Sequence, residues 1–586
     1  MQTIRISQLN LPVKEDAASA PGQTEKERQA LLLKKAARML HVRPEMISSL
    51  TIVRHGIDAR KKPDILHVYS VDVTLAKGGI SAEEVVRKCK DPRVRAAERP
   101  AFSFPSAGRD AAARMAAHAG GDCRPVIVGS GPAGLFAAYL LAEHGHKPLL
   151  LERGRCAEER TRDVRRFWES GELSPSSNVQ FGEGGAGTFS DGKLYTSVKD
   201  REGFFSEILR IFVAHGAPEE ILYEAHPHIG TDCLVKILKS MRERMLAAGA
   251  DIRFETQMTG LVTEQLSGES AGASGSGPAS GRKRRITGIL TDKGEISCAR
   301  VILAIGHSAR DTYEMLHAEG IAMEAKPFAA GFRIAHPQHL INEAMYGIAD
   351  PKTLSAAPYK LTYRTASGRS VYSFCMCPGG YIINASSEEG RLCVNGMSYA
   401  DRGGRYANSA IVVNVTPEDA GPELLLGIAF QRRMEEAAFL AGVGAVPVSD
   451  FAAFRKGASC AEQGQPPEGG GAGGGMELSG EVFRGKAVSA SLNGILPRPL
   501  EEALVEGILQ FDRTIPGFAG GDALLAAVES RTSAPLRMVR DAADLQSVSL
   551  SGLYPCGEGA GYAGGIMSAA ADGIRCAKAC AASFVS

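Results

Sequence analysis

The chain has 586 residues, of which 44% are hydrophobic and 23% are charged, as in ordinary globular proteins. Its 67 Lys and Arg residues nearly balance its 66 Asp and Glu residues, so no overall field attracts nucleic acid or an anionic membrane. No apolar run predicts a membrane span, and the first residues do not resemble a signal peptide. The 12 cysteines show neither a disulfide framework nor paired zinc-ligand spacing, so we expect a cytoplasmic protein without a metal site.

Residues 1–105 predict a small α+β domain. Some of its segments alternate apolar and polar residues, as strands do, and others repeat apolar residues with helical periodicity. The expected strands are 2–11, 48–55 and 65–75, and the expected helices are 25–40 and 81–89. This pattern predicts a two-layer sandwich.

A dinucleotide-binding unit follows over residues 126–153. An apolar strand leads into a glycine turn and a helix, and a second apolar strand ends in an acid about 20 residues after the first glycine, where a carboxylate meets a ribose. The glycines allow the turn, the approach of a pyrophosphate and close packing of the helix, whose N-terminus favours phosphate. The residues expected to hold the dinucleotide are Gly129, Gly131, Pro132, Ala133, Gly134, Glu152 and Arg153.

A glycine-rich loop covers residues 178–194. It contains a glycine triplet, but no strand precedes it, so it does not predict a second nucleotide site. We expect Gly184 and Gly185 to lie against the dinucleotide, where side chains would block close approach. The alternative is a flexible surface loop.

Two segments farther along the chain resemble parts of flavoproteins with two dinucleotide domains. Residues 251–258, ending in Met258, and a hairpin lead to a strand that ends in Ala304 and Gly306. At the C-terminus, a strand ends in Gly557 and Glu558, and a helix begins near Ile566. The resemblance implies that Glu558 binds the ribityl chain of FAD. It also implies that the backbone of Gly564, Gly565 and Ile566 stabilises negative charge near flavin N1.

The motifs at 181–194, 374–380, 395–399 and 554–562 resemble the bacterial FAD-dependent dehydrogenase family, whose substrate is undefined. The resemblance implies an α/β fold: a glutathione-reductase-like FAD/NAD(P)-binding Rossmann fold with an inserted mixed-sheet substrate domain and a small N-terminal α+β domain. The expected parts are an FAD-binding domain at 121–310 and 546–586, a substrate domain at 311–545, and low-complexity insertions at 267–285 and 464–475.

The catalytic residues are not identified by the sequence. Lys193, His307 and Tyr562 are candidate acid–base groups because each lies in a motif expected near the flavin. Cys375 and Cys377 suggest a redox dithiol, but a Cys-x-Cys bridge is strained, and buried structural thiols are the other interpretation.

Two arginines and a basic run carry further hypotheses. Arg531 and Arg537 would either clamp an anionic substrate or form structural ion pairs. The run 282–285 is interpreted as a solubilising surface patch.

The leading functional hypothesis is an FAD-dependent oxidoreductase that moves a hydride to or from flavin N5. Its substrate is a small molecule, and NAD(P)H is a candidate transient electron donor because no second nucleotide motif is present. A flavin-dependent RNA-modifying enzyme is an alternative, although the near-zero charge counts against nucleic acid. A non-catalytic flavin-bound sensor or assembly protein is another. The sequence leaves the oligomeric state open.

Overall fold

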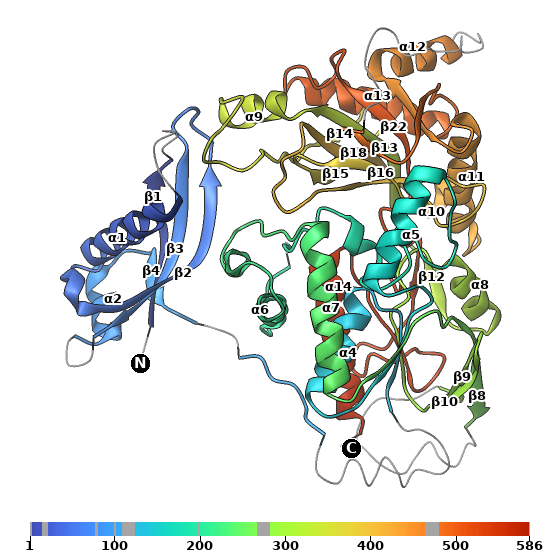
Figure 1. Ribbon diagram of the computed structural model, residues 1–586, viewed down its shortest axis with the longest axis horizontal. Helices are drawn as coiled ribbons and strands as arrows, with labels where there is room; N and C mark the ends of the chain where they lie inside the picture. Colours follow the sequence, from blue (N-terminus) through green and yellow to red (C-terminus); the bar gives the residue numbers. More distant parts are fainter. Residues whose placement is uncertain are drawn as a thin grey trace. The chain divides into compact units, whose positions relative to one another are not determined.

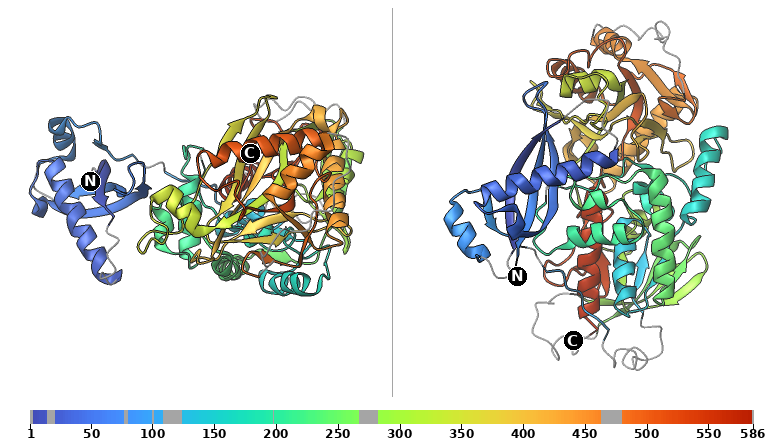
Figure 2. Two further views of the ribbon diagram at one scale, coloured as in Figure 1. Left: turned by 90° about the horizontal axis from the view of Figure 1, so that it is seen from above. Right: turned by 60° about the vertical axis from the view of Figure 1, so that its left-hand side comes forward.

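The computed structural model describes residues 3–13, 21–76, 80–98, 101–107, 124–196, 198–266, 282–462 and 480–584. The chain forms two compact units (Figures 1 and 2). The first contains residues 1–102, 199–228 and 339–357, and the second contains the rest. Insertion 464–475 and most of insertion 267–285 lie outside the described residues.

The small unit is built on a four-stranded antiparallel sheet of order β2-β3-β1-β4, with α1 and α2 packed on it. The alternation that predicts its strands buries Ile4, Ile6, Val71 and Val73 completely. Ser81 caps α2 by accepting a hydrogen bond from the Glu84 N–H. The elements are β1 (Thr3–Pro12), α1 (Pro21–Met39), β2 (Ile47–Asp58), β3 (Leu66–Leu75), α2 (Ala82–Cys89) and β4 (Val94–Ala96). All five predicted elements are present, and β4 was not predicted.

Two later segments complete the small unit. They contribute α6 (Phe204–Ala214) and most of α9 (Gln338–Tyr346). His55 on β2 lies 2.7 Å from a carboxylate oxygen of Glu224, which joins the sheet to the first of these segments. No sequence pattern marked either segment as part of this unit.

The second unit contains a five-stranded, wholly parallel sheet of order β24-β11-β5-β6-β7. Its strands are β5 (Val126–Val128), β6 (Leu149–Leu151), β7 (Asp251–Arg253), β11 (Val301–Leu303) and β24 (Leu553–Pro555). Helices α4 (Pro132–Glu143), α7 (Thr231–Ala247) and α14 (Ile566–Ala582) run side by side (Figure 1). The sheet therefore joins segments that lie more than 400 residues apart in the sequence, from Val126 to Pro555.

A seven-stranded sheet of order β14-β15-β18-β13-β22-β19-β21 lies in the chain between β11 and β24. It is mixed, as predicted, because β19 and β21 are parallel while the other neighbours are antiparallel. Helix α13 packs against β13, β14, β15 and β18. The strands are β13 (Phe328–Pro337), β14 (Thr362–Arg364), β15 (Ser370–Cys377), β18 (Tyr406–Val415), β19 (Val446–Asp450), β21 (Ala487–Ser489) and β22 (Leu524–Glu529). The larger helices of this region are α11 (Leu426–Ala441), α12 (Phe451–Glu462) and α13 (Arg498–Asp512).

Smaller elements connect these sheets. The remaining strands are β8 (Met258–Gln265), β9 (Arg284–Thr291), β10 (Gly294–Ser297), β12 (Met323–Ala325), β16 (Tyr381–Asn384), β17 (Val394–Met397), β20 (Phe483–Arg484) and β23 (Leu536–Met538). The remaining helices are α5 (Ala157–Ser170), α8 (Arg310–Ala318) and the single turn α10 (Pro417–Ala420). Strands β8 and β9 form the predicted hairpin.

The basic run at the end of the first insertion is not a simple surface patch. Arg282 donates hydrogen bonds of 2.6 and 2.8 Å to Asp544 and one of 2.7 Å to the Ser547 carbonyl. Arg284 donates to the Glu319 carbonyl at 2.7 Å. The surface-patch interpretation is therefore wrong for these two arginines, because their partners come from parts of the chain that sequence spacing does not reveal.

Candidate functional site

The glycine turn after β5 contains two glycines that the chain itself requires. Gly129 has φ +97°, and a Cβ there would lie 2.4 Å from the Ala304 carbonyl oxygen. A Cβ on Gly134 would lie 1.8 Å from the Gly129 carbonyl oxygen. Both positions therefore exclude side chains for steric reasons within the fold.

Gly131 differs because nothing in the chain excludes a side chain there. Its φ is −67°, and a Cβ would meet only the Gly185 Cα, at 3.8 Å. It is the N-cap of α4 and supplies no side-chain cap, while Pro132 begins the helix, followed by Ala133. The space beside Gly131 thus adjoins helix N–H groups suited to an anion.

Glu152, at the end of β6, ties three segments together. Its buried carboxylate accepts hydrogen bonds from the Ser130 N–H at 2.9 Å, the Ser130 hydroxyl at 2.7 Å, the Gly154 N–H at 2.9 Å and the Gly182 N–H at 3.0 Å. The neighbouring Arg153 instead donates to Asp311 on α8, and its guanidinium lies over the Phe181 ring. Glu152 therefore faces the glycine turn, whereas Arg153 faces α8.

The glycine-rich loop packs directly on this turn. The Gly184 N–H donates to the Ser130 carbonyl at 2.9 Å, and a Cβ on Gly185 would lie 2.8 Å from the Gly131 Cα. Arg160, from α5, is fully buried and fixes the loop. Its guanidinium donates to carbonyl oxygens of Asn178, Val179, Gly182 and Glu183 and to the Thr188 hydroxyl. Burial lowers the pKa of Arg160 to about 10, so the group stays cationic at neutral pH.

The segments after β11 and β24 meet at the same edge of the parallel sheet. The Tyr313 hydroxyl lies 2.9 Å from the carbonyl oxygens of both Gly306 and Gly559, which joins the two turns. His307 Nδ1 lies 3.3 Å from Glu558 Oε1. Sequence reasoning missed Tyr313, because its partners become visible only when the two strands pair.

The N-terminus of α14 opens beside Glu558. Its N-cap, Gly565, supplies no side-chain cap, and a Cβ on Gly564 or Gly565 would meet no atom within 4 Å. Ile566 begins the helix and lies 3.1 Å from where a Gly187 Cβ would stand. Both α4 and α14 are therefore preceded by glycines with open space beside them.

Met258 lies elsewhere. Its side chain is 3% exposed and belongs to the apolar core beneath the sheet, with Val126 and Leu151. Ala304 is also buried, and its N–H donates to the Val128 carbonyl at 2.8 Å. A cofactor contact of Met258 would have to come from its backbone.

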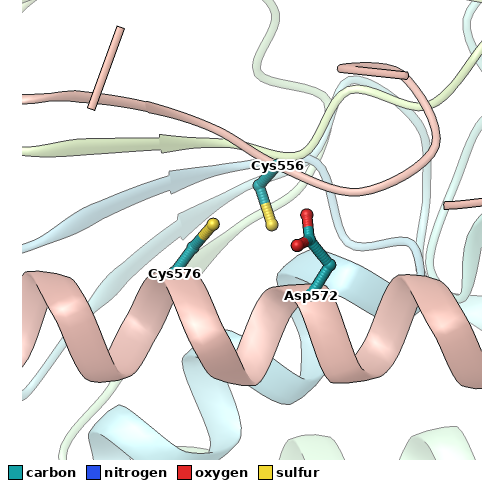
Figure 3. Close-up of side chains that lie close together, drawn as sticks. All are labelled: Cys556, Asp572 and Cys576. Atoms are coloured by element: carbon teal, nitrogen blue, oxygen red, sulfur yellow. The ribbon is translucent and has the colours of Figure 1, made fainter. Parts of the chain in front are cut away.

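Cys556, Asp572 and Cys576 form a buried cluster between β24 and α14 (Figure 3). Arg540 donates to both Asp572 oxygens, at 2.7 and 2.9 Å, and lies 3.3 Å from the Cys576 sulfur. The Gly557 N–H also donates to Asp572, at 2.8 Å. The guanidinium thus supplies the positive charge next to these side chains, and the cluster braces the turn that carries Glu558.

Three of the five candidate catalytic residues come together. Lys193 donates to the Met376 carbonyl, between Cys375 and Cys377, and lies 3.4 Å from Asp191. His307 lies instead beside Glu558. Tyr562 is separate: its hydroxyl donates to the Met538 carbonyl at 3.1 Å, and its ring lies under the Arg540 guanidinium.

A buried ionic cluster joins α8, α11 and the segment after β22. Glu435 is fully buried and accepts paired hydrogen bonds from Arg310, at 2.7 and 2.8 Å, and from Arg531, at 2.8 and 2.9 Å. Arg537 pairs with Glu324 at 3.2 Å. Arg531 and Arg537 therefore both form structural ion pairs, which is the second of the two alternatives that the sequence left open.

Comparisons with known proteins match three parts of the chain. Residues 3–74 match a domain of unknown function, DUF8436. Residues 127–167 match the NAD(P)-binding Rossmann-like domain, and residues 327–532 match the family described as FAD-dependent protein, C-terminal domain-like. Among the described helices, none is long and apolar enough to cross a membrane.

Several solved structures show a weak likeness. Thermovibrio ammonificans THI4 is 19% identical with a TM-score of 0.23, over 34% of this chain and 64% of that chain. Glycine oxidase from Bacillus cereus is 11% identical with a TM-score of 0.32, over 78% and 94%. L-amino acid deaminase from Proteus myxofaciens is 11% identical with a TM-score of 0.30, over 82% and 94%.

The parallel sheet, its glycine turn and the matched FAD-dependent C-terminal domain-like region indicate that FAD is the cofactor of the chain. An uncharacterized protein of Clostridium beijerinckii is 42% identical over 582 residues, which cover 98% of each chain. The chain therefore belongs to the same protein family as this clostridial protein. The substrate of the family is undefined.

Replacing Glu152 by alanine is expected to lower the FAD content of the purified protein at least tenfold. The change removes the expected ribose ligand and leaves the buried N–H groups of Ser130, Gly154 and Gly182 without their acceptor. Flavin released per chain, measured by absorbance after denaturation, checks this. Unchanged flavin content would contradict the ribose assignment, whatever happens to the melting temperature.

Proposed function

We propose that the chain transfers a hydride between a small-molecule substrate and N5 of a resident FAD, with NAD(P)H as a candidate electron donor. We further propose a glutathione-reductase-like arrangement of the FAD fold, with the substrate domain at 311–545. A cytoplasmic location without membrane or nucleic-acid partners is part of the same proposal. When bound, FAD supplies the group that accepts or donates the hydride.

The residues present fit FAD. Open space at Gly131 adjoins the N-terminus of α4, and open space at Gly564 and Gly565 adjoins the N-terminus of α14. We assign the diphosphate to the first helix end, because its N–H groups carry positive partial charge. The same reasoning assigns the second helix end to stabilising negative charge that develops on the reduced ring.

Two carboxylates complete the assignment. Glu152 lies at the end of β6 and would accept from the ribose, and Glu558 lies after β24 and would accept from the ribityl chain. His307, 3.3 Å from Glu558, is placed to hold that carboxylate in position. Gly184 and Gly185 would cover the diphosphate, since their loop packs on Gly131.

The observation that carries the proposal is the meeting of two uncapped helix N-termini and Glu558 at one sheet edge, from strands β5 and β24. A structural role alone explains Gly129 and Gly134, and the positive φ of +126° explains Gly565, but neither explains why Gly131 and Gly564 lack side chains in open space. A ligand that approaches the backbone closely does explain it.

Anaerobic reduction of the holoenzyme tests the proposal. The protein is mixed with NADH, NADPH and a panel of reduced metabolites, and flavin bleaching near 450 nm, the usual oxidised-flavin band, is followed. We expect at least one donor to bleach the flavin in a single-turnover reaction that saturates with donor concentration. If chemical dithionite bleaches the flavin but no donor does, the hydride-transfer proposal fails.

A further inference from the structure

The backbone at Cys375 is distorted in a way that a purely structural strand does not need. The pairing of β15 with β18 shifts register between Phe374 and Cys377, which marks a bulge. Cys375 itself has φ +45°, in the left-handed region. Bulges and left-handed non-glycine residues cost free energy and concentrate beside functional sites.

The bulge lets the Cys377 thiol reach back to the backbone of Cys375. In a regular strand, residues two apart lie about 6.5 Å from one another on the same face. Here the Cys377 thiol donates to the Cys375 carbonyl oxygen at 3.2 Å. The segment is therefore not a regular strand at the two cysteines.

Two cations, each paired with a carboxylate, flank the two cysteines: Arg333 lies 2.9 Å from Glu529 and Lys193 lies 3.4 Å from Asp191. Arg333, fully buried on β13, donates to the Cys375 carbonyl at 2.7 Å and lies 3.7 Å from the Cys377 sulfur. Lys193 donates to the carbonyl of the residue between the cysteines. The hydrogen bond from Cys377 lowers the pKa of Cys375 to about 5, and Lys193 and Arg333 add to this against the effect of burial.

The two cysteines differ as attacking and resolving thiols differ. Cys375 is partly exposed and ionised at neutral pH, whereas Cys377 is fully buried and burial holds its pKa well above the ordinary value. In the other close pair, Cys556 and Cys576, both residues are fully buried, and the hydrogen bond from Cys576 together with burial raises the pKa of Cys556. Only the first pair combines access with a thiolate.

We propose that Cys375 and Cys377 form a redox dithiol whose substrate is a disulfide. The Cys375 thiolate attacks one sulfur of R–S–S–R, forms a mixed disulfide and releases RS⁻. Cys377 gives its proton to this RS⁻ and attacks the Cys375 sulfur, which breaks the mixed disulfide and releases the second RS⁻. The products are the Cys375–Cys377 disulfide, RSH and RS⁻, and two electrons pass from the dithiol to the substrate. The return of electrons from FAD to the protein disulfide rests on the proposed function.

Electron counting on the holoenzyme tests this proposal. The protein is treated anaerobically with excess hydroxyethyl disulfide, desalted and titrated with dithionite. We expect about four electron equivalents per flavin for the wild type and about two for Cys375→Ser. Cys377→Ser lacks the resolving thiol, so it should stop at the mixed disulfide and carry one hydroxyethylthio group on Cys375, detected by mass. The treated wild type also loses two titratable thiols, and mass spectrometry locates the loss at residues 375–377. Cys233→Ser, which removes a partly exposed cysteine on α7, should still give four.

The pH profile of alkylation supplies an independent readout. Because only the thiolate reacts, iodoacetamide should label Cys375 with a midpoint near pH 5, and Lys193→Met should raise that midpoint by about one unit or more. Two electron equivalents in the wild type, with no thiol loss, would overturn the dithiol proposal while leaving hydride transfer intact. If the Cys375–Cys377 disulfide forms but no donor reduces the flavin, only the proposed function is overturned.

Discussion

Replacing Glu435 by glutamine is expected to lower the free energy of unfolding by about 3–5 kcal/mol, because one member of a buried ion cluster loses its charge. The carboxylate is fully buried and lies between the guanidinium groups of Arg310 and Arg531. Burial alone would raise the pKa of Glu435, but Arg310 and Arg531 lower it below the usual range. Neutralising Glu435 leaves these two cations in the interior with only Glu388 as a full counter-charge.

The pH dependence has a defined sign. Because the folded-state pKa is lowered, the contribution of Glu435 is present above the ordinary value of 4.5 and is lost as pH falls below it. The difference between wild type and Glu435→Gln should therefore be largest near neutral pH and shrink in acid. Urea unfolding at several pH values measures it.

The next residue is a matched control. Glu436 is 47% exposed and pairs with Arg391 at the surface, so Glu436→Gln should cost less than about 1 kcal/mol. Equal losses for the two variants would show that the buried cluster contributes no more than a surface pair.

Replacing Gly131 by alanine is expected to lower FAD affinity by a factor of about ten or more, which is about 1.4 kcal/mol. The alanine fits the chain, because its Cβ would meet only the Gly185 Cα, at 3.8 Å. The stability of the flavin-free protein should therefore change by less than about 0.5 kcal/mol. The loss must then come from the diphosphate, which the new methyl group keeps away from the N-terminus of α4.

Two further glycines serve as controls for the Gly131→Ala variant. Gly521→Ala also enters open space, far along the chain, and should leave FAD affinity unchanged. Gly134→Ala should prevent proper folding, since its Cβ would lie 1.8 Å from a backbone oxygen. FAD affinity is measured by equilibrium dialysis of the refolded flavin-free wild type, Gly131→Ala and Gly521→Ala. An unchanged affinity for Gly131→Ala would show that the diphosphate does not bind at this turn.

The sequence was most informative where the backbone alone determines the geometry. The glycine turn, the acid after β6 and the paired strands of the small unit follow from local patterns that physical chemistry restricts tightly. The family resemblance predicted that the segments after 303 and 555 meet, and in the parallel sheet β11 pairs with both β5 and β24. The identity of the individual ligand contacts stays a prediction.

The charged interior could not be predicted from local patterns. Arg160, Arg310 and Glu435 lie in helices that look like ordinary charged helices, and their partners come from distant segments. Arg333 gave one usable signal, because it is a lone charge in the otherwise apolar strand β13. The bulge at Cys375 gave none, since a register shift depends on the neighbouring strand.

Identification of the flavin released from the purified wild-type protein tests the central claim most directly. The account predicts about one FAD per chain, separated by chromatography after denaturation and recognised by its mass and absorbance. Protein that carries no FAD and binds none when it is supplied, or that carries a nicotinamide dinucleotide in its place, would contradict it.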